Sequence, residues 1–115
     1  MMSNEMNFVG FISFTLITTG KMDIKNVILS SSWPSVLSWP RGAPRCDIRP
    51  GHGVQTPDNL NVAVNKMGPG EWKVSAFLAQ FQDKENTTIW QITVPGSFKG
   101  IILNSATEGR DIIIS

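Results

Sequence analysis

The sequence contains few of the residues that build cross-links or metal centres. Its 115 residues include one cysteine, Cys46, and one histidine, His52. A single cysteine excludes an internal disulfide and a multi-cysteine zinc site. Other metal sites need three or four converging ligands, so we expect no metal and no cofactor. The proline- and glycine-containing segment between Cys46 and His52 fixes no geometry between a thiolate and a base, and we expect no enzymatic activity.

The chain also has almost no net charge. Ten lysine and arginine residues against nine aspartate and glutamate residues give +1 at pH 7. Such a chain has no global field to attract nucleic acid, so we expect no nucleic-acid partner, and an anion site would need a local basic cluster. The hydrophobic fraction of 41% is typical of a folded protein. The length suits one hydrophobic core, so residues 1–115 are predicted to form a single domain.

Long apolar runs are missing as well. The candidate for a targeting segment is FVGFISFTLITTG, residues 8–20, which is shorter than the roughly 20 residues that a membrane-spanning helix needs. The residues before it contain Glu5 and no lysine or arginine, unlike the basic start of a secretory signal. We therefore expect a soluble protein without a signal peptide, in which residues 8–20 form a buried strand.

Apolar residues show no stripe at helical spacing, and glycine or proline recurs about every ten residues. Alternation is frequent instead, and it is cleanest where Leu60, Val62 and Val64 alternate with Asn61 and Ala63. Short alternating runs separated by turns are typical of a β-sandwich or a small closed barrel. We predict an all-β fold, an antiparallel β-sandwich of about seven strands with one long irregular loop. The predicted strands are residues 8–20, 23–30, 60–65, 72–81, 88–94, 101–103 and 112–114.

Two of these runs carry further expectations. In residues 72–81, Val74, Ala76 and Leu78 share one face and Phe77 and Phe81 the other, so this strand is predicted to be covered on both sides or to meet a ligand with its second face. It is predicted to form a hairpin with residues 88–94. The run at 112–114 is predicted to be an edge strand or to pair with another protomer.

About thirty residues with five prolines separate the predicted strands at 23–30 and 60–65. Loops of this length are usually functional or disordered. Guanidinium groups suit phosphate or carboxylate, and tryptophan prefers positions that are half apolar and half wet. The pattern predicts a site for a lipid headgroup, a sugar or a base; alternatively, the tryptophans are core residues and the arginines are solvated or paired. The candidate ligand-binding residues are Trp33, Trp39, Arg41, Arg45, Arg49 and Trp90.

Three motifs, in this order, resemble the aegerolysin family. Residues 14–33, FTLITTGKMDIKNVILSSSW, are similar to a strand pair of the form I-x-N-x-x-L-S that ends on a tryptophan, with Ile24, Asn26, Leu29, Ser30 and Trp33 in the corresponding places. Residues 56–64, TPDNLNVAV, resemble a proline-led turn into an N-V-N-type strand, and residues 89–99, IWQITVPGSFK, resemble a tryptophan, proline, glycine-serine segment. The resemblance implies a β-sandwich that binds membrane sphingolipids, often as one component of a pore-forming pair.

The sequence leaves three functional hypotheses. The first is a non-enzymatic module that binds a membrane lipid headgroup through the tryptophans and arginines of the long loop. The second is a carbohydrate-binding module in which an aromatic face stacks on a sugar while Asn59, Asn61 and Asn65 supply hydrogen bonds. The third is a structural or assembly protein that forms homo-oligomers, with Phe77, Phe81 and the C-terminal strand buried between protomers.

Overall fold

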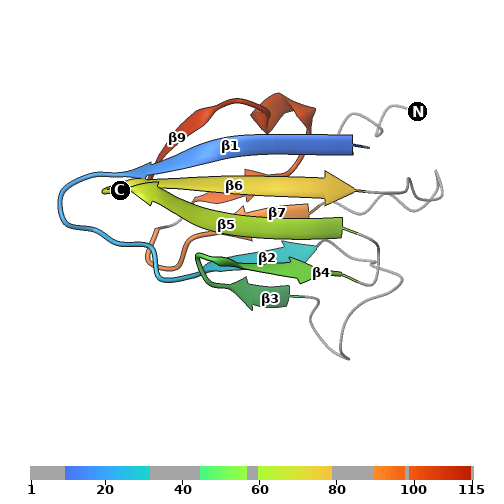
Figure 1. Ribbon diagram of the computed structural model, residues 1–115, viewed down its shortest axis with the longest axis horizontal. Helices are drawn as coiled ribbons and strands as arrows, with labels where there is room; N and C mark the ends of the chain where they lie inside the picture. Colours follow the sequence, from blue (N-terminus) through green and yellow to red (C-terminus); the bar gives the residue numbers. More distant parts are fainter. Residues whose placement is uncertain (1–9, 32–44, 57–59, 79–89, 98, 115) are drawn as a thin grey trace.

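The computed structural model describes residues 10–31, 45–56, 60–78, 90–97 and 99–114, which form two sheets packed face to face (Figure 1). This arrangement confirms the predicted all-β sandwich. Within the described residues there are nine strands and one short 3₁₀ helix. The strands are β1 (Gly10–Thr18), β2 (Val27–Ser31), β3 (Arg45–Ile48), β4 (His52–Gln55), β5 (Leu60–Gly68), β6 (Glu71–Leu78), β7 (Trp90–Thr93), β8 (Gly100–Ile102) and β9 (Asp111–Ile114), and the 3₁₀ helix is η2 (Ser105–Thr107).

One sheet has five strands in the order β4-β5-β6-β1-β9, and the other has four in the order β3-β2-β7-β8. Neighbouring strands are antiparallel except for β1 and β9, which run parallel. Both sheets are thus mainly antiparallel, as predicted, and the parallel pair β1–β9 is where the beginning and the end of the described chain lie side by side. The prediction of an edge strand at residues 112–114 is confirmed, because β9 lies at the end of its sheet.

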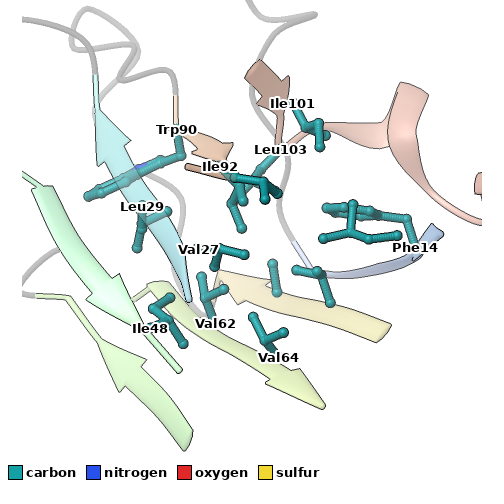
Figure 2. Close-up of a cluster of buried hydrophobic side chains, with 14 of the residues drawn as sticks. Phe14, Val27, Leu29, Ile48, Val62, Val64, Trp90, Ile92, Ile101 and Leu103 are labelled. Atoms are coloured by element: carbon teal, nitrogen blue, oxygen red, sulfur yellow. The ribbon is translucent and has the colours of Figure 1, made fainter. Parts of the chain in front are cut away.

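The core lies between the two sheets and follows the alternation of the sequence. On β5, Leu60, Val62 and Val64 are buried while Asn61 and Asn65 are exposed, as predicted. Figure 2 shows side chains of β1 and β5 meeting those of β2, β7 and β8 across the interior. Apolar burial of this kind contributes roughly 25 cal/mol for each Å² removed from water. The buried aromatic and aliphatic residues labelled there are Phe14, Val27, Leu29, Ile48, Val62, Val64, Trp90, Ile92, Ile101 and Leu103.

The long predicted loop contains two strands that the sequence pattern did not indicate. They are β3 and β4, four residues each, and each lies at an edge of its sheet. An edge strand pairs on one side only and tolerates polar residues. Within β3, Ile48 is buried, and within β4, Val54 is half-buried while its neighbours are exposed. So few apolar positions give no alternation to detect.

Strand β6 forms a hairpin with β5. Pro69 and Gly70 join the two strands, which pair along their length, with glycine at the second central position at φ +73°. The hairpin between residues 72–81 and 88–94 was wrong, because β6 pairs with β5 and β1 in one sheet and β7 with β2 and β8 in the other. Alternation shows that one face of a strand is apolar. It does not show whether two such strands pair within one sheet or pack against each other from different sheets.

The first half of β1 extends beyond β9, which pairs only with residues 15–18 of that strand. Beside this first half of β1, the segment after η2 forms hydrogen bonds with β1 in place of a neighbouring strand. The Gly109 N–H donates to the Ser13 carbonyl at 2.7 Å, and the Ser13 N–H donates to Oε1 of Glu108 at 2.9 Å. These bonds pair backbone groups of β1 that would otherwise need water. The free side of β1 is therefore hydrogen-bonded as far as Ser13.

Candidate ligand groove on the five-stranded sheet

The predicted loop site is only partly within the described residues. Trp33, Trp39 and Arg41 lie outside them. Arg45 is the first residue of β3, and Arg49 is exposed after the last residue of that strand. The described residues therefore do not test whether the predicted tryptophans and arginines meet, and lipid binding by this loop stays a prediction.

Trp90, the sixth candidate, lies inside the sandwich. It is the first residue of β7, pairs with Ser31 of β2, and is only 6% exposed (Figure 2). Trp72 of β6 is also buried, and the ammonium group of Lys66 lies 5.3 Å from the centre of its ring. The two tryptophans in the described part of the chain thus stabilise the core, and neither presents its ring at the surface.

Cys46 and His52 belong to different sheets, on β3 and β4. The Cys46 sulfur lies 3.6 Å from the carbonyl oxygen of Asp47. Burial, and secondarily the negative charge of Asp47, raises the pKa of the Cys46 thiol. A raised pKa keeps the sulfur protonated at neutral pH, the opposite of an activated nucleophile. Among the described residues, no three His, Cys, Asp or Glu side chains are grouped to hold a metal ion.

The outer face of the five-stranded sheet carries a row of four large side chains. Strand register places Gln55 of β4 opposite Asn61 of β5, Asn61 opposite Phe77 of β6, and Phe77 opposite Phe11 of β1. Paired residues of neighbouring strands project from the same face of a sheet. All four are exposed, Phe11 at 61% and Phe77 at 42%. Two aromatic rings and two side-chain amides thus face solvent in one line across the sheet.

The next row on the same face consists of small residues. Gly53, Ala63 and Ser75 are opposite one another on β4, β5 and β6. Because these residues are small, they leave a hollow of about 390 Å³ beside the row of large side chains, lined by both rows and by the backbone between them. This volume falls within the range of about 300–1,000 Å³ that is usual for ligand sites. A smaller hollow of about 180 Å³ lies at Asp23–Asn26 and Val94–Pro95.

The larger hollow, which we call the groove, has an uncharged lining. Its described lining residues include no ionisable side chain: they are Phe11, Gly53, Val54, Gln55, Asn61, Val62, Ala63, Ser75, Ala76 and Phe77. An apolar surface disfavours a charged ligand, because desolvating an unpaired charge is costly. The amides of Gln55 and Asn61 each offer a donor and an acceptor. The groove therefore suits a neutral ligand with an apolar face and a hydrogen-bonding rim.

The sequence indicated part of this groove. Phe77 lies on the opposite face of its strand from the apolar residues Val74, Ala76 and Leu78, and this pattern predicted that the second face would meet a ligand or be covered. Asn61 was predicted as a sugar contact. Phe11, Gln55 and Gly53 were missed as site residues. Gln55 and Gly53 were assigned to the long loop, and the proximity of Phe11 to Phe77 depends on a strand pairing that sequence alternation does not reveal.

Comparisons with protein-family models, with curated proteins and with solved structures gave no match to this chain. The similarity to aegerolysins thus stays a prediction. Among the described residues, no helix is long and apolar enough to cross a membrane.

Proposed function

We propose that the protein is a non-enzymatic carbohydrate-binding module and that the groove binds a neutral glycan. The observation that carries the proposal is the row of Gln55, Asn61, Phe77 and Phe11 in strand register on one exposed face. A sugar ring has a face of C–H groups and a rim of hydroxyls. The rings of Phe77 and Phe11 offer apolar area for the C–H face, and the amides of Gln55 and Asn61 offer partners for the hydroxyls.

Charge favours a neutral glycan over a phosphate-bearing headgroup at this place. The described residues that line the groove have no lysine, arginine or histidine, so a phosphate there would find no charged donor. The nearest charged side chain along β6 on the same face is Lys73, two positions beyond Ser75. It lies outside the lining residues.

The test is binding of soluble neutral oligosaccharides, with cello-, xylo- and chito-oligosaccharides as probes, followed by isothermal titration of any that bind. Phe77→Ala removes one ring from the groove and is expected to weaken binding about tenfold, which corresponds to about 1.4 kcal/mol. Ile113→Ala is the matched control, because Ile113 is an apolar residue 47% exposed on the same sheet but is not a lining residue. It should leave binding unchanged.

The amides offer a second matched pair. Asn61 and Asn65 are both exposed on β5 and share its outer face, but only Asn61 lines the groove. Asn61→Ala is expected to weaken glycan binding about fivefold, the effect of losing one hydrogen bond worth about 1 kcal/mol, while Asn65→Ala should have no effect. Equal effects of the two changes would contradict the site.

Two results would replace the proposal. If the wild-type protein binds none of the probes and light scattering finds a dimer that Phe77→Ala converts to a monomer, this face is covered by a second copy of the chain and serves assembly. If it instead pellets with sphingolipid vesicles and binds no glycan, the lipid-binding prediction is favoured.

A further inference from the structure

The long axis of the groove follows from the strands that supply its side chains. Its four large side chains come from four neighbouring strands, β4, β5, β6 and β1, and not from successive positions on one strand. Neighbouring strands lie about 4.8 Å apart, so the row spans roughly 14 Å from Gln55 to Phe11. The floor residues Gly53, Ala63 and Ser75 follow the same direction beside it. The hollow thus runs across the strands.

The two ends of the row differ in chemistry. Gln55 and Asn61, on β4 and β5, supply amides, whereas Phe77 and Phe11, on β6 and β1, supply aromatic rings. A single sugar in contact with Phe11 would not reach Gln55 at the other end of the row, because Phe11 and Gln55 lie three strands apart. Contact with both ends requires a longer molecule with repeated hydroxyl rims and apolar faces.

Resting on the proposed function, we infer that the groove binds an extended oligosaccharide that lies across the strands, and that its ligand is a chain of several sugars. One part of the chain packs on Phe77 and Phe11, and another bonds to Asn61 and Gln55. Ala63 and Ser75 lie below the middle of this path, where a larger residue would block it. A long ligand contacts both Gln55 and Phe11, whereas a short ligand contacts only one of them.

The experiment measures affinities for two lengths of one probe series, the disaccharide and the hexasaccharide of the cello- and of the chito-oligosaccharides. The proteins are the wild type, Gln55→Ala, Phe11→Ala and Ala63→Leu, with Asn65→Ala as the control on the same face. The inference expects the hexasaccharide to bind more tightly than the disaccharide and to lose about fivefold in affinity with each of the two end variants. It expects the disaccharide to respond to at most one of them, and Ala63→Leu to weaken the hexasaccharide.

Three outcomes would overturn the inference. Equal affinity for both lengths would limit the ligand to a small sugar, and so would a hexasaccharide response to only one end variant. An unchanged hexasaccharide affinity in Ala63→Leu would place the chain elsewhere. In each case the wild type still binds glycan, so carbohydrate binding itself stands, whereas absence of all binding removes both the inference and the proposed function. The changed side chains sit on the outer face, and thermal unfolding of each variant checks that it is folded.

Discussion

At the scale of single residues, the side of the sheet on which a residue lies decides its role. On β1, Phe14 is 1% exposed and Phe11 is 61% exposed, although they are the same residue type on the same strand. The first is enclosed between the sheets, where large side chains stabilise by burial and close packing. The second gains little from burial, so its aromatic area is available to a ligand.

This difference predicts unequal losses of stability. Phe14→Ala is expected to lower the free energy of unfolding by about 3–5 kcal/mol, because it leaves a cavity in the core. Phe11→Ala should lower it by less than about 1 kcal/mol, since it changes only an exposed strand position. Urea unfolding of both variants measures the two values. Similar losses would show that Phe11 is packed against something in the folded chain.

Cys46 gives a prediction about pH. Burial and then the charge of Asp47 raise the pKa of its thiol in the folded protein. The pH profile of its alkylation by iodoacetamide should therefore have a higher midpoint in the native protein than in the same chain unfolded in urea. A native midpoint equal to or below that of the unfolded chain would contradict the environment described for Cys46.

The same shift sets the sign of a stability effect. Because the thiol pKa is raised by folding, the contribution of Cys46 to stability is fully present below the unfolded-state pKa and is lost as the pH rises through the folded-state pKa. The difference in unfolding free energy between the wild type and Cys46→Ala should shift against the wild type over this alkaline range. It should be constant at neutral and acidic pH.

At the scale of elements, the strands with clean alternation were predictable, whereas the two edge strands β3 and β4 were not. The pattern of Leu60, Val62 and Val64 indicated β5 because one of its faces is fully buried. β3 and β4 pair on one side only and bury little, so their sequences carry no comparable pattern. The groove also depends on β4, which the sequence did not reveal, and on the pairing of β1 with β6, which are distant in sequence. For this reason only Phe77 and Asn61 could be anticipated.

In the turn between β5 and β6, the backbone conformation and a close contact both restrict the residue at Gly70. Gly70 has φ +73°, and a Cβ there would lie 3.2 Å from the carbonyl oxygen of Thr18. Gly20 has a similar φ of +65° but no neighbour within 4 Å of such a Cβ. Alanine at either position costs about 1–2 kcal/mol in backbone strain. Gly70→Ala should be the more destabilising of the two in urea unfolding, and equal losses would mean that the contact with Thr18 relaxes freely.

At the scale of the whole molecule, the inner and outer faces of the two sheets have different roles. Their inner faces form the core (Figure 2), and the outer face of the larger sheet holds the groove. With a net charge of +1 and no ionisable residue among the described lining residues, the proposed glycan recognition rests on shape, apolar contact and hydrogen bonds. Long-range attraction contributes little to such binding.

Salt dependence follows from this. Glycan affinity should change by less than about twofold between 20 mM and 500 mM sodium chloride, because no charge pair is formed that ions could screen. Binding to anionic phosphate through Arg45 or Arg49 would instead weaken steeply over the same range. A strong salt effect on glycan binding would therefore point to the arginines and away from the groove.

We propose that a neutral oligosaccharide binds across the outer face of the five-stranded sheet. The most direct test is a nuclear magnetic resonance titration of the isotope-labelled protein with the cello- and chito-hexasaccharides. We expect chemical-shift changes in the side-chain amides of Gln55 and Asn61, the rings of Phe11 and Phe77, and the backbone amides of Ala63 and Ser75, with the backbone amides of β2 and β7 unchanged. Absence of shifts, or shifts confined to residues outside the groove, would contradict it.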